Sequence, residues 1–325
     1  MKIGKDVAKA ASVLKAGGLV AIPTETVYGL AANAFDPQAV VGIYEAKQRP
    51  SFNPLIMHTD SLEKVKAWVA EFPPLTNALA ERFWPGPLTL LLPRKTIVPD
   101  IVTAGLPRVG VRIPQNPLTL SLLSQIDFPL AAPSANPFGY ISPTTAEHVA
   151  QQLGEQVDYI LDGGPAQVGI ESTIVGFEAD GSPTLYRLGG IALEEIEAIT
   201  GPLKRFTLSE NPQTSGMLKS HYAPRVALHL GNLDELIAEF GTQNVAILSF
   251  REAVKGIESS LQRQLSPAGS LNEAAQNLFA TLRELDQLPV QYILAEEVPA
   301  EGIGLAINDR LQRARFEHRQ KPSEK

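Results

Sequence analysis

Cysteine is missing from this sequence of 325 residues, and histidine occurs only five times. The absence of cysteine excludes disulfides, thiolate metal sites and cysteine nucleophiles. The histidines are scattered and show no paired spacing, so a zinc site built from protein ligands is not expected.

The chain also has no excess of basic residues. The 28 Lys and Arg residues are outnumbered by 35 Asp and Glu residues, which gives a formal net charge of -7, and both parts of the chain about Thr200 are acidic. A general nucleic-acid surface normally needs a basic face. Stable nucleic-acid binding is therefore not expected, whereas a small basic pocket is compatible with this charge.

Long apolar runs are absent as well. Lys9 and Lys15 interrupt the N-terminal segment, and neither a signal peptide nor a transmembrane segment is predicted. The expectation is a cytoplasmic protein without membrane contact.

The apolar pattern present indicates two domains, a larger one at 1–202 and a smaller one at 225–325. In the first, Asp36-Pro37 is a typical helix start, and Thr144-Thr145-Ala146-Glu147 resembles a capping box. Helices are expected at 5–16, 37–47, 62–69, 75–83, 145–153 and 191–199, and strands at 19–23, 55–58, 88–92, 109–113, 129–132, 159–161, 173–177 and 184–188. Because the helices are unevenly placed, the fold class predicted is α/β with a twisted mixed sheet flanked by helices.

The segment 203–224 is polar and has few apolar anchors, which is typical of a linker or lid. A regular alternation follows it, with strands expected at 226–230, 245–249 and 292–295, and helices at 232–240, 271–285 and 303–315. This alternation predicts a small Rossmann-like domain with a parallel sheet.

Two short segments combine proline with polar side chains. Residues 47–55 read Lys-Gln-Arg-Pro-Ser-Phe-Asn-Pro-Leu, and residues 133–137 read Pro-Ser-Ala-Asn-Pro. Lys47 and Arg49 at a rigid turn suit a phosphate-rich ligand, because Arg offers a planar fork and Lys a compact charge. The plain alternative is a surface helix end, where cations are favoured.

Further candidates lie beside the expected strands. Asn53 and His58 flank the apolar residues 54–57, and either can be structural. Arg112 lies in an apolar strand, so it meets either a carboxylate of the protein or an anionic ligand. The remaining candidates are 23–30, 133–136, 169–173 and 187–189, each of which also has a structural interpretation.

Strand ends in open sheets often converge on one crevice. We therefore expect Lys47, Arg49, Arg112 and Arg187 to line it, with hydroxyls and amides around them. There is no Walker loop, no Gly-x-Gly-x-x-Gly and no Ser-His-Asp order with an elbow motif. The chemistry predicted is the handling of phosphate or carboxylate by positioning and charge stabilisation, without a covalent enzyme intermediate.

These motifs, taken in order, resemble the YrdC-like family over roughly residues 5–200. The resemblance rests on Pro-Thr-Glu-Thr-Val-Tyr-Gly-Leu at 23–30, Lys-x-Arg-Pro-x-x-Asn-Pro-Leu at 47–55, Pro-Gly-Pro-Leu-Thr at 85–89, Val-Arg-Ile-Pro at 111–114, Pro-Ser-Ala-Asn at 133–136, Ser-Pro-Thr at 142–144, Gly-Ile-Glu-Ser-Thr at 169–173 and Arg-x-Gly at 187–189. His-Tyr-Ala-Pro at 221–224 and Gly-Ile-Gly-Leu-Ala-Ile at 302–307 resemble the extra domain of two-domain threonylcarbamoyl-AMP synthases.

The resemblance implies a nucleotidyltransferase that converts ATP, L-threonine and bicarbonate into threonylcarbamoyl-AMP, pyrophosphate and water. The product would serve threonylcarbamoyladenosine modification of tRNA next to the anticodon, through hand-off to a separate tRNA threonylcarbamoyl transferase complex. Mg²⁺ is expected with ATP, without dedicated protein ligands.

The resemblance also implies the roles of individual residues. Lys47, Arg49 and Arg112 are expected to neutralise charge during catalysis, with Arg112 on the threonine carboxylate. The residues expected around threonine are Thr26, His58, Arg112, Ala132 (through its backbone) and Ser172. Those expected around ATP are Lys47, Arg49, Asn53, Arg108, Ser134, Asn136, Ser142, Arg187 and Tyr222. Tyr222 is expected to cover the nucleotide, which would make the linker a lid that excludes water.

Two local features depart from the family pattern. Arg108 stands where a smaller residue is expected, so only its backbone is expected beside ATP. Residues 138–141, Phe-Gly-Tyr-Ile, replace a more polar stretch.

Two other functions are weighed against the synthase. An RNA-binding module is disfavoured by the net charge of -7. A carbamoyl-transfer domain of hydrogenase maturation shares the fold, but such proteins carry cysteine-rich zinc segments and this chain has no cysteine.

Overall fold

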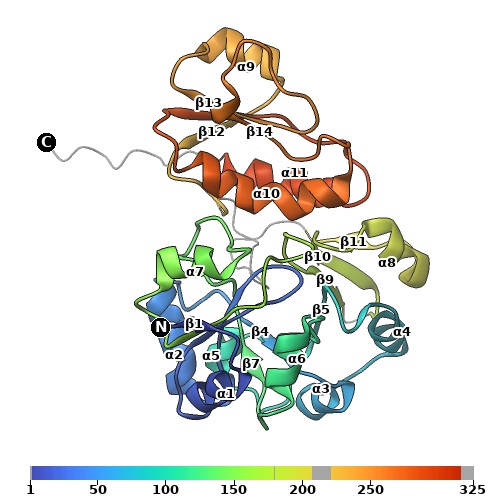
Figure 1. Ribbon diagram of the computed structural model, residues 1–325. Coiled ribbons are helices and arrows are strands. Elements are labelled where there is room, and N and C mark those ends of the chain that lie inside the picture. Colours follow the sequence, from blue (N-terminus) through green and yellow to red (C-terminus); the bar gives the residue numbers. More distant parts are fainter. Residues whose placement is uncertain (1, 179, 207–220, 316–325) are drawn as a thin grey trace, which may run out of the picture. The chain divides into compact units, whose positions relative to one another are not determined.

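The computed structural model describes residues 2–178, 180–206 and 221–315, which belong to two compact units. Of these residues, 2–138 and 142–206 form the first unit. The second unit contains 221–315 together with the short segment Gly139–Ile141. Each unit has its own sheet (Figure 1).

The first unit is built on one mixed sheet. Within the described residues it has eleven strands in the order β1-β8-β2-β3-β7-β4-β6-β5-β9-β10-β11. Their bounds are β1 Ile3–Gly4, β2 Val20–Ile22, β3 Gly29–Asn33, β4 Ile56–His58, β5 Leu88–Pro93, β6 Arg108–Arg112, β7 Leu130–Ala131, β8 Tyr159–Leu161, β9 Thr173–Phe177, β10 Pro183–Arg187 and β11 Lys204–Arg205. Parallel pairs such as β4 with β6 alternate with antiparallel pairs such as β5 with β6, which confirms the predicted mixed sheet.

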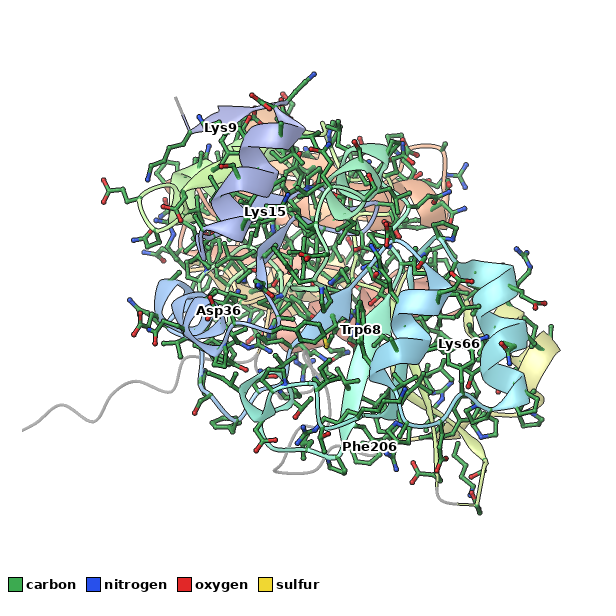
Figure 2. The ribbon with its side chains drawn as sticks, turned by 90° about the horizontal axis from the view of Figure 1, so that it is seen from below. Lys9, Lys15, Asp36, Lys66, Trp68 and Phe206 are labelled. Carbon is green, nitrogen blue, oxygen red and sulfur yellow. The ribbon has the colours of Figure 1, made fainter. Side chains whose placement is uncertain are left out.

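Eight helices of the first unit lie in the described part of the chain. Their bounds are α1 Val7–Lys15, α2 Pro37–Lys47, α3 Leu62–Trp68, α4 Pro74–Phe83, α5 Asp100–Thr103, α6 Pro117–Leu123, α7 Ala146–Leu153 and α8 Leu193–Thr200. In α1 the Asp6 side chain caps the N-terminus, Leu14 is buried, and Lys9 and Lys15 lie on the exposed side (Figure 2).

The local sequence determines where helix α2 begins and ends. Asp36 caps it by accepting from the backbone N of Gln38 at 2.9 Å, and Pro37 occupies the first position, as predicted. The helix ends where Gln48 adopts a left-handed conformation, with φ of 52°. The Arg49 backbone N then donates to Tyr44 O at 2.9 Å, which closes the last turn.

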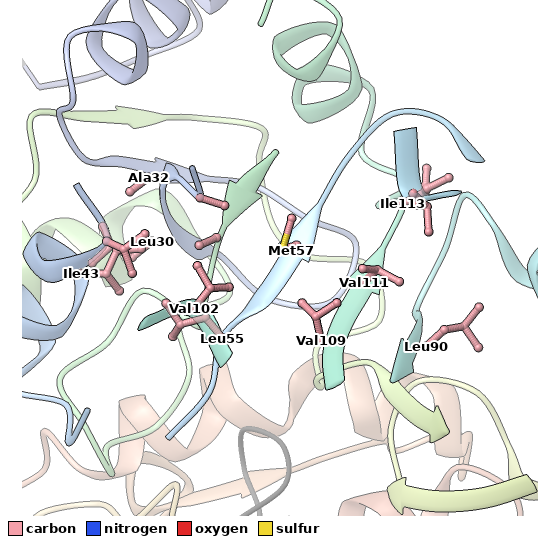
Figure 3. Packing of buried hydrophobic residues seen from close by; sticks show 14 of the residues in the cluster. Leu30, Ala32, Ile43, Leu55, Met57, Leu90, Val102, Val109, Val111 and Ile113 are labelled. Atoms are coloured by element: carbon pink, nitrogen blue, oxygen red, sulfur yellow. The ribbon is translucent and has the colours of Figure 1, made fainter. Parts of the chain in front are cut away.

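One face of this sheet carries the main hydrophobic core. Side chains alternate across the strands, so Met57 of β4 and Val109 and Val111 of β6 point to the same side (Figure 3). They pack with Leu90 of β5 and with residues of α2, including Ile43.

The opposite face is divided in two. Toward β8, β2 and β3 it is covered by α1 and α6, whose Leu14 and Leu122 pack with Val20 and Ile22 of β2. Toward β4, β6, β5, β9 and β10 it carries a small apolar cluster of Ile56, Leu91, Ile174 and Tyr186, packed with Phe206. Polar side chains fill the rest of this second part, which positions the candidate site described below.

The second unit has a four-stranded parallel sheet in the order β12-β15-β13-β14, as predicted for the small domain. The strands are β12 Ala227–Leu230, β13 Val245–Ser249, β14 Gln262–Gln264 and β15 Tyr292–Ala295. Its helices are η1 Ser259–Leu261, α9 Leu233–Phe240, α10 Leu271–Leu285 and α11 Gly304–Ala314. Helix α9 lies on one side of this sheet, and α10 and α11 lie on the other (Figure 1). None of the helices in the described ranges is long and apolar enough to cross a membrane.

Several elements differ from the sequence predictions. Strand β3 and helix α6 are not predicted, and residues 204–205 of the expected linker extend the first sheet as β11. Residues 207–220 of that linker lie outside the described residues. The capping box expected from Thr144 is wrong by one position, because Thr145 is the residue whose hydroxyl accepts from the His148 backbone N.

Candidate active site

Polar side chains occupy the part of the first sheet that no helix core covers. His58 and Arg112 are register partners at the ends of β4 and β6. Both alternate with the core residues Met57 and Val111, so they project to the other face.

The candidate residues form two groups at opposite ends of the short strand β4. Asn53 precedes the strand, near Lys47, Arg49, Ser134 and Asn136. The other group, at the His58 end, contains Arg112 with Thr26, and Ser172 with Arg187. Parallel β4 and β6 place Asn53 and Arg112 at different ends. The expectation that these residues line one crevice stays a prediction.

Arg112 forms a buried network with the segment after β2. Its Nη2 lies 2.6 Å from Glu25 Oε1, its Nη1 2.9 Å from Thr26 Oγ1, and its Nε 3.1 Å from Gly86 O. Glu25 Oε2 also accepts from the Gln115 backbone N at 2.9 Å. Of the two alternatives left open for Arg112, the structure shows the protein carboxylate, and the guanidinium has five N–H groups, of which three make these bonds.

His58 is buried beside Arg112. Its Nδ1 lies 3.2 Å from Ile56 O. Burial, followed by the neighbouring Arg112 charge, lowers the pKa of His58 to about 3. The imidazole is therefore neutral at physiological pH and acts as a hydrogen-bonding group, not as a cation.

Ser172 lies between two neighbours just before β9. Its hydroxyl is 2.8 Å from Thr89 Oγ1 of β5 and accepts from Arg187 Nη2 at 2.9 Å. Arg187 Nε also donates to Ser172 O at 3.0 Å. The Arg187 guanidinium thus fixes both the backbone and the side chain of Ser172.

Lys47 is buried at the end of α2 and holds the segment after β7. Its Nζ donates to Ser134 O at 2.5 Å and to Asn136 O. Burial, followed by the Arg49 charge, lowers the pKa of Lys47 well below its usual value. No carboxylate pairs with Lys47 among the residues that the structure describes.

Asn53 is the most unusual residue of this group. Both polar atoms of its amide are buried and have no hydrogen-bond partner within the described ranges. Arg49 braces the same turn, donating to the backbone oxygens of Asn53 at 3.2 Å and Pro54 at 3.1 Å. Because an unsatisfied buried amide costs about 1–3 kcal/mol, the arrangement indicates a place for a polar ligand.

Three more candidates have defined contacts. Ala132 N donates to Ile56 O at 3.0 Å, which fixes the chain before Ser134. Ser142 Oγ donates to Glu171 Oε1 at 2.6 Å. Asn136 is buried, and its amide donates to Pro137 O at 2.9 Å.

Two further candidates, Arg108 and Tyr222, contact residues outside these two groups. Arg108 Nη1 donates to the Tyr186 hydroxyl at 2.5 Å, and its Nη2 lies 3.6 Å from Glu178 Oε2. Tyr222 belongs to the second unit, where it stacks on Phe279 at 5.3 Å and lies under the Arg310 guanidinium at 5.4 Å.

The sequence analysis assigned no role to Glu25, Glu171 or Thr89. A usable signal exists for the two carboxylates. Glu25 is the only charged residue between Lys15 and Asp36, and Glu171 is the only one between Asp162 and Glu178. Such isolated charges in apolar segments tend to be buried with a partner. Thr89 gives no comparable signal.

No group of three or more His, Asp or Glu side chains that could hold a metal ion occurs in the described part of the chain. The two carboxylates that contact candidate site residues in the bonds described above, Glu25 and Glu171, accept hydrogen bonds from protein donors.

Comparison with known proteins identifies the family. A family model described as "Telomere recombination" matches residues 12–189, and one described as "Threonylcarbamoyl-AMP synthase, C-terminal domain" matches residues 191–315. The chain is 42% identical over 323 residues to a threonylcarbamoyl-AMP synthase of Bacillus subtilis, covering 95% of this chain and 92% of the relative. It is 40% identical over 320 residues to one of Pyrococcus abyssi, covering 94% and 92%.

A solved structure agrees with the sequence relatives. The crystal structure of P. abyssi Sua5 complexed with L-threonine superposes with a TM-score of 0.88 at 39% identity, covering 95% of this chain and 94% of that one. The chain therefore belongs to the YrdC-like threonylcarbamoyl-AMP synthase family of enzymes, in its two-domain form.

Proposed function

We propose that the chain is an L-threonylcarbamoyladenylate synthase, a nucleotidyltransferase that makes threonylcarbamoyl-AMP and pyrophosphate from ATP, L-threonine and bicarbonate. Family membership supports the reaction, and a relative solved with L-threonine supports the amino acid. The product serves threonylcarbamoyladenosine modification of tRNA next to the anticodon.

The observation that carries this proposal is the pair of buried cationic groups at the two ends of β4. Lys47 lies at the end near Asn53, and Arg112 lies at the end near His58. With a rise of about 3.3 Å per residue, Asn53 and His58 are separated by roughly 16 Å at most. That span accommodates a nucleoside triphosphate with an amino acid beside its α-phosphate.

Threonine binds at the Arg112 end in this proposal. Arg112 has two N–H groups beyond the three bonds described above, and these donate to the substrate carboxylate. Thr26 and Ser172 offer hydroxyls, and neutral His58 offers a ring nitrogen. The Ala132 backbone contributes the remaining contact.

ATP binds at the Lys47 end. Lys47 and Arg49 neutralise phosphate charge, and the Asn53 amide gains the partner that it lacks in the described structure. The other contacts proposed at this end come from Ser134, Asn136, Ser142 and the Arg108 backbone, and Arg187 is proposed to reach ATP from the other end, where it contacts Ser172. Tyr222 is the residue proposed to cover the nucleotide.

The chemistry proceeds by positioning and charge stabilisation. The threonine amine attacks the carbon of bicarbonate, an N–C bond forms, and water leaves to give a carbamate. A carbamate oxygen then attacks the α-phosphorus of ATP, and the bond to the β-phosphate breaks to release pyrophosphate. Lys47, Arg49 and Arg112 offset the repulsion between the two anions, and Mg²⁺ enters as part of the MgATP substrate. No enzyme nucleophile is needed.

The test is pyrophosphate release from MgATP. Release is expected only when threonine and bicarbonate are both present. Threonine-independent hydrolysis of ATP, or equal release with either co-substrate omitted, would reject the proposal.

After synthesis, the product has to reach the enzyme that modifies tRNA. We propose that the labile adenylate passes to a separate tRNA threonylcarbamoyl transferase complex, and that the synthase does not bind tRNA stably. A filter-binding titration with tRNA across salt concentrations tests this, since tight binding that weakens steeply with salt would contradict it.

A further inference from the structure

The loop after Asn136 passes from one compact unit to the other and back. Residues Gly139–Ile141 belong to the second unit, whereas Phe138 and Ser142 on either side belong to the first. We call residues 137–142 the crossing loop. Its residues 138–141 are also the stretch that departs from the polar composition expected of the family.

Both flanks of the crossing loop contact candidate site residues of the first unit. The Phe138 backbone N donates to Lys47 O at 2.9 Å, and the Arg49 guanidinium lies 5.9 Å from the centre of the Phe138 ring. On the other flank, Ser142 donates to Glu171 at 2.6 Å. A displacement of the loop would therefore move groups that the proposed function places around ATP.

The three residues at the tip of the loop are each held by the second unit. The Tyr140 hydroxyl donates to Asp286 Oδ2 at 2.5 Å. Arg283 of α10 lies 5.2 Å from the centre of the Tyr140 ring, and its Nη2 donates to Ile141 O. The Ala223 backbone N donates to Gly139 O at 2.9 Å.

Asp286 is a rigid anchor for this tip. It follows α10 directly, and its carboxylate is completely buried. It also accepts from Arg225 Nε at 3.1 Å and from the Val226 backbone N at 2.9 Å. A buried carboxylate with three donors has one defined position, so the tyrosine that it binds has one as well.

We propose that the second unit positions the crossing loop for nucleotide binding through Tyr140, Arg283 and Asp286, which act as positioning residues for the reaction proposed above. Ordering a loop costs conformational entropy. Because contacts with α10 already order the tip in the folded chain, ATP binding does not have to supply the free energy for ordering the loop. None of the hydrogen bonds described above joins the loop to Arg112 or His58, so threonine binding is expected to depend on this anchor less than ATP binding does.

The decisive variant is Tyr140→Phe in the full chain. It removes the hydroxyl that Asp286 binds and keeps the ring that Arg283 covers. Loss of a hydrogen bond to a charged group corresponds to roughly a tenfold change, so we expect KM for ATP to rise about tenfold. The KM for threonine and kcat at saturating ATP are expected to stay the same.

Two further variants give the experiment its controls. Asp286→Asn is expected to shift KM for ATP in the same direction. Adding it to Tyr140→Phe should raise KM for ATP little further, because the contact with Tyr140 is the one through which Asp286 is proposed to affect ATP binding. Tyr292→Phe deletes the same atom from β15 of the same unit and should change neither constant. If Asp286→Asn does not fold, the KM for ATP of Tyr140→Phe alone tests the inference.

An unchanged KM for ATP in Tyr140→Phe overturns the inference, as does an equal rise in both KM values. Direct calorimetry of ATP binding distinguishes failure of this inference from failure of the proposed reaction. If the parent chain makes no threonylcarbamoyl-AMP but Tyr140→Phe still weakens ATP binding relative to Tyr292→Phe, the reaction is wrong and the positioning role holds.

Discussion

At the scale of single residues, the site consists of polar groups that folding has removed from water. Lys47 and Arg112 are both buried, but Arg112 has a carboxylate beside it whereas Lys47 is bound only to backbone oxygens. Burial of such groups is unfavourable unless they are paired. At such residues, a substitution that removes the buried polar group can raise the stability of the protein and at the same time weaken ligand binding.

Asn53 gives the clearest case of this opposition. Replacing Asn53 by Leu removes the unsatisfied amide at similar volume, so the free energy of unfolding should rise by about 1 kcal/mol while ATP affinity falls about tenfold. Denaturant unfolding and calorimetry measure the two effects. Asn116→Leu is the contrast, because it removes the cap of α6 and should lower stability by about 1 kcal/mol without weakening ATP. A destabilised Asn53→Leu with normal ATP affinity would contradict the assignment.

Arg112 should discriminate between the two substrates. In Arg112→Ala, threonine binding should weaken more than ATP binding, because the lost partner is a carboxylate. The variant should also lose about 3–5 kcal/mol of stability, since Glu25 is left buried and unpaired, so calorimetry is done at low temperature. Arg108→Ala, from the other end of β6, should leave threonine binding intact. Equal weakening of both substrates by Arg112→Ala would reject its role.

His58 makes stability depend on pH. Its pKa is lowered to about 3 in the folded chain, against about 6.5 when unfolded. Between these values the unfolded state binds the extra proton, so stability is fully present above about pH 6.5 and is lost as pH falls, by at most about 1.4 kcal/mol per pH unit. Urea unfolding of His58→Gln at about pH 6.5 and 4.5 should show a shallower decline than the parent. Identical declines would show that His58 is not buried as a neutral group.

At the scale of elements, the backbone before β9 depends on close packing against the turn after β10. A Cβ at Gly189 would lie 2.3 Å from the carbonyl carbon of Ser172 and 2.4 Å from Glu171 O. Gly189→Ala should therefore displace Ser172, reduce stability by about 1–3 kcal/mol and weaken threonine binding.

The matched control lies in α2. A Cβ at Gly42 would come no closer than 3.6 Å to the Leu19 side chain. Gly42→Ala should raise the free energy of unfolding by up to about 1 kcal/mol, because Ala favours the helix. Both effects are measured by denaturant unfolding. If Gly189→Ala leaves the free energy of unfolding unchanged, the backbone at Ser172 can move aside to make room for the added methyl group.

Elements with strong local signals were predictable from the sequence, and those made by pairing were not. Asp36-Pro37 marks the start of α2, whereas β3 is Gly-Leu-Ala-Ala-Asn, which has low strand propensity and is a strand because β2 and β7 pair with it. Helix α6 begins with Asn116-Pro117, a signal of the same kind as that of α2, so it could have been predicted.

The same distinction holds for the site. The motifs identified the residue types, but the separation of Asn53 from Arg112 depends on the register of β4 with β6, which no local pattern encodes. The Glu25 partner of Arg112 follows from the need to pair a buried cation, although only the structure selects which carboxylate does so.

At the scale of the whole molecule, the proposals assign the second unit two parts in ATP binding, namely the cover by Tyr222 and the hold on the crossing loop. Deleting residues 203–325 removes Tyr222 and the groups that hold Tyr140, so turnover should fall and KM for ATP should rise. Steady-state kinetics of the truncated chain measure both. An unchanged rate in a folded truncated chain would refute the cover by Tyr222 and would also oppose the anchor of the crossing loop.

The central claim is that one site joins threonine, bicarbonate and the adenylyl group of ATP. The most direct measurement is mass spectrometry of the product formed from MgATP, threonine and carbon-13 bicarbonate. The account predicts threonylcarbamoyl-AMP that carries the labelled carbon, together with one pyrophosphate for each adenylate. Threonyl-AMP without the label, or AMP and pyrophosphate without an adduct, would contradict it.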